Sequence, residues 1–153
     1  MHAESENLGW KYQDDIQFGV SLLAITQPAD ITTYYSCSMS LYSTDWDMLS
    51  TDIRQEEAKF QWILGINPHG NVGSPSDRTS TLSWDPSQFS EQGYYRLIKG
   101  YDNETQEVIV GDMRTTTEIQ ITGGNSEQFF TIIWFPIQDE FEFALDAGWN
   151  LIS

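Results

Sequence analysis

The sequence has little cysteine, and this shortage removes several kinds of site. Its 153 residues contain a single cysteine, Cys37, which excludes an intramolecular disulfide and a two-cysteine zinc or redox centre. Cys37 lies in the stretch 34–42, where alternation groups it with Tyr35, Met39 and Leu41. We therefore expect it to be a buried, small apolar side chain rather than a reactive thiol.

Positive charge and long apolar runs are also scarce. Seven Lys and Arg stand against 23 Asp and Glu, a formal net charge of −16. This charge repels phosphate backbones and anionic lipid, so we expect no nucleic-acid binding, whereas neutral polymers, cations and basic partners stay open. No apolar run reaches the roughly 18 residues of a membrane span, so we expect no membrane insertion. Aromatic residues make up 14% of the chain, which favours one folded domain over an acidic disordered tail.

Catalytic signatures are missing as well. His2 and His69 are the only histidines. We assign His2 to a tag or linker over residues 1–9 and His69 to an ordinary surface loop, so neither a histidine triad nor a zinc centre is expected. Some pair among 23 acids always meets the separation that glycoside hydrolysis needs, but no spacing singles one out. We expect a protein that is not an enzyme and requires no cofactor.

Apolar and polar residues alternate with a period of two along most of the chain, and clusters of Gly, Pro, Asn and Asp separate the alternating segments. Residues 51–59 are expected to form a loop or one helical turn. The pattern predicts an all-β fold, an antiparallel β-sandwich of the immunoglobulin-like or jelly-roll kind. The expected strands are residues 16–25, 33–42, 59–66, 80–84, 94–101, 107–111, 116–122, 128–135, 141–145 and 149–152.

One passage occurs twice. Asp52-Ile53-Arg54 precedes the aromatic run 60–64, and Asp112-Met113-Arg114 precedes the run 129–134. Alternation places the Asp and the Arg of each step on one face of a strand, where they can pair with each other or with the other copy. We expect a structural clasp at an edge of the sandwich, and a ligand-binding Arg is the alternative. The core is expected to contain Trp62, Trp84, Trp134, Phe60, Phe130 and Leu82.

The chain divides into three parts by pattern. Residues 1–9 are expected to be a tag or linker, residues 10–138 the β-sandwich module, and residues 139–153 either its final strands or the beginning of a following β module. The last segment alternates and ends within an apolar run. An exposed final strand can also pair with the edge of a neighbouring molecule, which allows strand-mediated self-association.

Short landmarks follow one another along the chain: Trp10, 15–19, 40–42, 51–54, Trp62, 81–85, 111–114 and 130–132. In this order they resemble a β-sandwich accessory module found near the C-terminal ends of large secreted bacterial proteins, beside dockerins, sorting domains or polysaccharide-degrading enzymes. The segment 148–153 resembles the opening strand of small β modules repeated in such proteins. The resemblance implies a secreted or cell-surface multidomain protein, although the Pro-rich stretch expected after the first strands is reduced to residues 27–30.

A second set of aromatic residues lies beside polar residues or in turns: Trp46, Tyr34, Tyr42, Tyr94 and Tyr101. Such rings can stack on the apolar faces of sugars while neighbouring polar groups bind the hydroxyls. Alternatively, these tyrosines only cover strands and keep their hydroxyls in water. Asp45 and Asp47 flank Trp46 and supply hard oxygen ligands for calcium, with solvated loop acids as the alternative.

We therefore expect a non-catalytic extracellular accessory module that binds polysaccharide through surface aromatics, with Ca²⁺ as an optional ligand. The alternative is a structural, sorting or assembly module that has no glycan ligand and contacts neighbouring modules of the same polypeptide.

Overall fold

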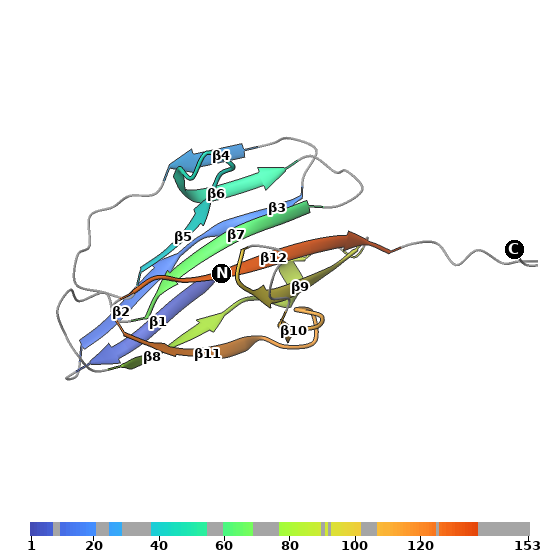
Figure 1. Ribbon diagram of the computed structural model, residues 1–153. Helices are drawn as coiled ribbons and strands as arrows, with labels where there is room; N and C mark the ends of the chain where they lie inside the picture. The colour runs from blue at the N-terminus through green and yellow to red at the C-terminus, as the bar shows by residue number, and fades with distance from the viewer. Residues whose placement is uncertain are drawn as a thin grey trace, which may run out of the picture.

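Alternating sequence forms strands throughout the part of the chain that the computed structural model describes, which comprises residues 1–7, 10–20, 25–28, 38–54, 60–68, 77–89, 91, 93–101, 107–124 and 126–137. These strands make a four-stranded and an eight-stranded sheet. The sheets pack against each other as two layers (Figure 1). The predicted all-β sandwich is confirmed.

The small sheet has the strand order β11-β8-β1-β2. Its inner face carries the apolar side chains, since Ala3, Leu82 and Ile121 are buried while Thr79 and Thr122, which point the other way, are exposed. This alternation is what a sheet with one buried face requires. Its strands are β1 (His2–Asn7), β2 (Trp10–Asp15), β8 (Arg78–Ser83) and β11 (Glu118–Gly123).

The large sheet has the order β10-β9-β12-β7-β5-β6-β3, and β4 also pairs with β6. The β3–β6 pair is parallel, and the other described strand pairs are antiparallel. A single-turn 3₁₀ helix, η1 (Pro86–Gln88), follows β8. The strands of the large sheet are β3 (Gln17–Val20), β4 (Ile25–Pro28), β5 (Ser38–Tyr42), β6 (Met48–Arg54), β7 (Phe60–Asn67), β9 (Gly93–Lys99), β10 (Val108–Val110) and β12 (Gln128–Pro136).

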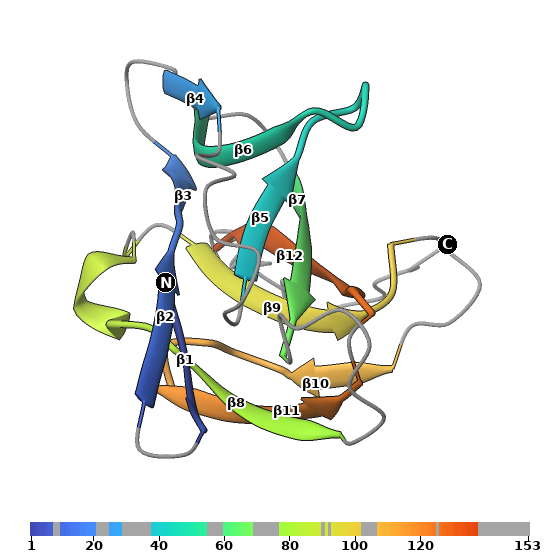
Figure 2. The same ribbon diagram turned by 90° about the vertical axis from the view of Figure 1, so that its left-hand side faces the viewer.

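The chain passes between the two sheets at several points, and one of these passages is direct. Strand β2 of the small sheet runs on into β3 of the large sheet (Figure 2). Ile16, between the two strands, is buried. The Asp14 carboxylate accepts a hydrogen bond from the Met39 amide at 2.8 Å, which ties β2 to β5. The crossing is thus fixed both by apolar burial and by a bond between the sheets.

The core between the sheets is built on three tryptophans. Trp62, Trp84 and Trp134 are buried, together with Phe130 and Leu82, so these core predictions are confirmed. Buried indoles need partners for their N–H groups. Trp62 Nε1 donates to the Asp52 carbonyl at 3.0 Å, and Trp84 Nε1 donates to the Met113 carbonyl at 2.7 Å. The side chain of Phe60, although it belongs to β7, is outside the described set.

The structure differs from the sequence-based expectation in several places, among them the following three. Residues 1–9, expected to be a tag or linker, contribute β1, which pairs with β2 on one side and β8 on the other. The loop or helical turn expected over 51–59 is wrong for its first residues, because 51–54 belong to β6. The single strand expected over 16–25 is replaced by β3 and the start of β4. In each case ladder partners decide the structure, because strand preference depends on context more than on composition.

Some expectations fall outside the described residues. These are Cys37, His69 and the strands over 141–145 and 149–152.

Candidate functional site

The two Asp-x-Arg steps are each closed on themselves. Arg54 Nη2 lies 2.7 Å from the Asp52 carboxylate, and Arg114 Nη2 lies 2.8 Å from that of Asp112. Each guanidinium also stands over a ring, Arg54 at 5.5 Å from the Trp62 centroid. The pairing expected within each step is confirmed. The clasp was also predicted to lie at an edge of the sandwich. For Asp52 and Arg54 this part is wrong, because β6 lies inside the sheet.

Asp112 and Arg114 shift each other's acidity. Hydrogen bonds from the Arg114 side chain hold the pKa of Asp112 below its usual value, and the same bonds raise the pKa of Arg114. In both steps the arginine Nε and Nη2 groups are held by the aspartate of the same step. This pairing favours the expected structural clasp over a ligand-binding Arg.

Four aromatic side chains meet at one end of the large sheet, and we call this group the aromatic corner: Tyr42, Trp46, Tyr101 and Phe129. They come from the end of β5, the β5–β6 turn, the residues after β9 and the start of β12. Ring centroids lie 5.1 Å apart for Trp46 and Tyr101, 5.0 Å for Tyr101 and Phe129, and 5.6 Å for Tyr42 and Trp46. The Trp46 ring stands at 86° to Tyr101 and 90° to Phe129, the edge-to-face arrangement that aromatic quadrupoles favour.

The turn that carries Trp46 is tight and well bonded. The Ser43 amide donates to the Asp47 carbonyl at 3.0 Å, and Ser43 Oγ accepts from the amides of Asp45 and Asp47 at 3.2 and 3.0 Å. Trp46 has a φ of 66°, the left-handed region that bulky residues rarely adopt. Its side chain is 47% exposed. A large ring is thus presented to solvent from a backbone conformation that suits glycine far better.

A carboxylate borders the corner beside Tyr42. The Tyr42 hydroxyl donates to both oxygens of Glu127, at 2.7 and 2.8 Å. Burial, and then the Glu127 hydrogen bond, raise the pKa of Tyr42 above its usual value, so the phenol keeps its proton. Gly65 of β7 makes room for this pair, because a Cβ there would collide with the Glu127 carboxylate and the Tyr42 ring. Glycine within a strand commonly marks such a close approach.

The structure brings together three of the five predicted ligand-binding aromatics, although one of them, Tyr42, is buried and is not the surface ring that the sequence predicted. Tyr42, Trp46 and Tyr101 meet in the corner, whereas Tyr94 lies at the far end of β12, stacked on Phe135 at 5.2 Å. Tyr34 lies outside the described residues.

Two members of the site were missed by sequence reasoning, Phe129 and Glu127. Phe129 had a signal, since it precedes the buried Phe130 in a strand and must point to the opposite face. Glu127 had none, because only the pairing of β12 with β7 brings it over Gly65.

Asp45 and Asp47, the predicted calcium ligands, flank Trp46 and are both exposed. Among the residues that the structure describes, no group of three or more His, Cys, Asp or Glu is placed to hold a metal.

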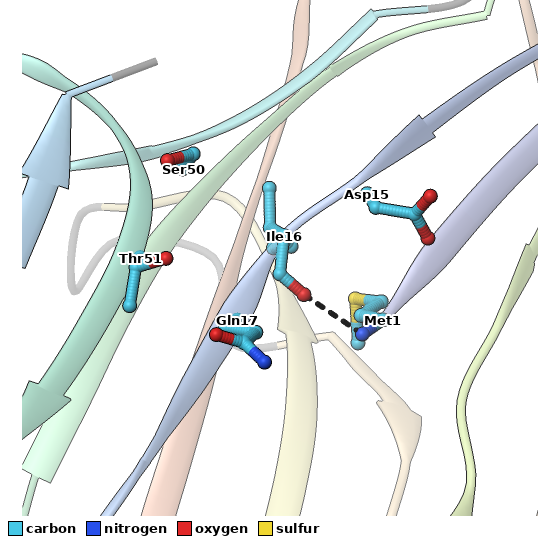
Figure 3. Close-up of a pocket in the computed structure, with 6 residues that line it drawn as sticks. All are labelled: Met1, Asp15, Ile16, Gln17, Ser50 and Thr51. Atoms are coloured by element: carbon cyan, nitrogen blue, oxygen red, sulfur yellow. Dashed lines mark hydrogen bonds between the residues drawn. The ribbon is translucent and has the colours of Figure 1, made fainter.

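A depression of about 500 Å³ lies on another part of the surface, between the crossing strand and β6 (Figure 3). Its charged groups are already engaged. The Met1 ammonium donates to the Ile16 carbonyl at 2.9 Å, and burial lowers the pKa of this ammonium. The Asp15 carboxylate lies 2.9 Å from His2 Nδ1. The depression offers a ligand little beyond the Gln17, Ser50 and Thr51 side chains that line its rim.

Comparison with protein-family models, curated proteins and solved structures gave no match for this chain. Over the described ranges, no helix has the length and apolarity needed to cross a membrane. We therefore infer function from the geometry of the aromatic corner.

Proposed function

We propose that this chain is a non-catalytic carbohydrate-binding module that holds a polysaccharide at the aromatic corner. The observation that carries the proposal is Trp46, which is 47% exposed in a left-handed backbone conformation. An exposed indole contributes little to a core, and the conformation costs free energy. A ring kept in such a position is well suited to contact something outside the protein.

The shape of the corner fits a sugar ring. Pyranose rings have apolar C–H faces that pack on aromatic rings, while their hydroxyls need polar partners. Because Trp46 and Tyr101 stand at 86°, they do not form one flat platform. A sugar that stacks on one ring has the edge or face of the other beside it, and the carboxylates of Glu127, Asp45 and Asp47 lie close by as hydroxyl acceptors.

We further propose that the module acts outside the cell, as part of a secreted or cell-surface multidomain protein. The resemblance of residues 10–135 to accessory modules of such proteins supports this placement. The net charge of −16 opposes nucleic acid and anionic lipid as partners of the corner, whereas it tolerates a polysaccharide.

The proposal is tested by retention on insoluble polysaccharides of several linkages. We expect the wild-type protein to be retained by at least one, and Trp46→Ala to weaken retention by roughly tenfold or more, as truncation of a central aromatic contact does at other interfaces. Tyr94→Ala is the matched control, since it removes an aromatic from the same sheet outside the corner and should leave retention unchanged. Melting temperatures of all three proteins establish that they are folded.

Two results would count against the proposal. If no polysaccharide retains the wild-type protein, the result favours the alternative function. The chain would then be a structural, sorting or assembly module without a glycan ligand. If Tyr94→Ala abolishes retention and Trp46→Ala does not, the binding surface lies at the other end of β12.

A further inference from the structure

Among the described residues, acidic side chains border the aromatic corner. Glu127 touches the Tyr42 hydroxyl, and Asp45 and Asp47 adjoin Trp46 in the turn. Among the described residues, the basic group nearest in sequence is Lys99, two positions before Tyr101, and its ammonium lies 3.8 Å from Glu107. The field at the corner is therefore negative, in line with the net charge of −16.

Glu127 still has hydrogen-bonding capacity. A carboxylate offers about four lone-pair directions, and the single Tyr42 proton is shared between both oxygens. An incoming group that only donates suits this acceptor best. An ammonium supplies three donors and no acceptor, whereas a carboxylate of an acidic sugar supplies none and is repelled.

The rings add a second attraction for the same kind of group. A cation within about 6 Å of the face of a Trp or Tyr ring is drawn to its quadrupole, most strongly for Trp. The corner presents Trp46 and Tyr101, which are 47% and 46% exposed. Ring faces and carboxylates thus favour one chemical feature, a positively charged amine on an otherwise stackable sugar.

We infer that the corner selects polysaccharides that carry free amino groups, such as polymers of glucosamine. This substrate class rests on the proposed carbohydrate function and narrows it. The sugar ring stacks on Trp46 or Tyr101, its ammonium lies near Glu127 or the turn carboxylates, and acidic polysaccharides are excluded. The overall negative charge speeds the approach of such a cationic polymer.

The test compares soluble oligosaccharides of equal length built from glucosamine, N-acetylglucosamine and glucose, by calorimetry at a mildly acidic pH that keeps the amino group protonated. We expect the glucosamine oligomer to bind roughly tenfold more tightly than the other two, since exposed cation–π and charge-assisted contacts each contribute a modest amount. Added salt should reduce this preference, because screening weakens exposed ion pairs.

Variants locate the effect. Glu127→Gln keeps an acceptor for Tyr42 but removes the charge, so we expect its affinity for the glucosamine oligomer to fall much more than its affinity for the two neutral oligomers. Glu118→Gln removes the same charge from an exposed position of β11, in the other sheet, and should behave as wild type.

The possible results are distinguishable. Equal affinity of wild type for all three oligomers, or binding of none of them, overturns the inference. The proposed function is decided separately, by the retention assay on insoluble polysaccharides. An equal loss in Glu118→Gln shows that overall charge and not the corner gives the preference. An oligolysine of matched charge that binds as tightly as the amino sugar also overturns the inference, because the corner would then recognise amines without regard to the sugar.

Discussion

At Trp46 the backbone conformation is strained, whereas the ring makes favourable contacts. Its φ of 66° places the Cβ against the local backbone, a strain that a glycine would not feel. Its ring gains edge-to-face contacts with Tyr101 and Phe129 at 5.1 and 5.9 Å. These contacts hold the turn in its conformation. The ring contacts offset the backbone strain. The ring lies where solvent and ligands can reach it.

This balance gives a prediction that separates backbone strain from side-chain loss. Trp46→Ala and Trp46→Gly both remove the ring, so they lose the same contacts and the same glycan retention. They differ in the backbone alone. We expect the Gly variant to be more stable than the Ala variant by about 1 kcal/mol, the reverse of the usual order within strands. Chemical denaturation of the two variants measures this difference.

A matched comparison at Asp47, which has no positive φ, should give the ordinary order, with Ala at least as stable as Gly. If Trp46→Ala equals or exceeds Trp46→Gly in stability, the turn relaxes out of the left-handed conformation once the ring is gone.

The Asp-x-Arg steps show how one short motif is used by two different elements. In the first, Asp52 and Arg54 lie in β6, and the Asp52 side chain is 6% exposed. In the second, Asp112 and Arg114 lie in a turn after β10, and both side chains are about a third exposed, at 27% and 33%. The distances within the pairs are nearly equal. Burial, not geometry, should therefore set their contributions to stability.

We predict that Asp52→Ala costs about 2 to 3 kcal/mol, because it leaves the Arg54 charge without its buried partner. Asp112→Ala should cost at most about 1 kcal/mol, as exposed pairs do. Urea unfolding of both variants tests the contrast, with Glu118→Ala as an exposed acid outside any pair. Equal costs for Asp52→Ala and Asp112→Ala would show that burial does not decide their strength.

The pH dependence gives an independent check on the second pair. The lowered pKa of Asp112 means that its carboxylate binds protons less readily in the folded chain than in the unfolded chain. Its contribution is present above the usual Asp range and disappears as pH falls through the lower folded pKa. The stability difference between wild type and Asp112→Ala should therefore shrink in acid.

The elements that sequence alone predicted are those with clean alternation and bulky side chains, such as β12 and β7. Two of the elements it missed, β1 and β6, are largely polar. Strand β1 reads HAESEN, and of its described side chains only Ala3 reaches the core. Strand β6 buries Thr51 and Asp52 next to each other, which breaks a period of two. Both are held by neighbours on each side, and such pairing cannot be seen in a local pattern.

At the scale of the whole molecule, the same limit applies to the site. The sequence identified Tyr42, Trp46 and Tyr101 as aromatics outside the core pattern, but their meeting point depends on the order β9-β12-β7-β5. That order brings Tyr101 and Phe129 to the β5–β6 turn. Tyr94 carries a similar local signal and yet lies at the other end of β12, since β9 runs antiparallel to it. The sequence pattern identifies candidate aromatic residues, and the strand order determines which of them lie together.

The net charge of −16 is a property of the molecule that no single contact offsets. The described ion pairs that include Arg or Lys number three, Asp52–Arg54, Glu107–Lys99 and Asp112–Arg114. Most acids are therefore left to repel one another, which opposes the compact state. At low ionic strength this repulsion acts over about 30 Å, and at 0.1 M salt over about 10 Å.

We therefore predict that sodium chloride stabilises the protein. Raising the salt from roughly 0.01 M to 0.1 M should increase Tm by on the order of 5 °C, because screening weakens repulsion between like charges more than it weakens the few pairs. Calcium chloride at equal ionic strength is the informative control. If screening alone acts, the two salts give the same Tm, whereas a bound calcium ion adds stability at millimolar concentration that a chelator removes. A Tm that does not respond to sodium chloride would mean that the acids are spread so widely that their repulsion does not limit stability.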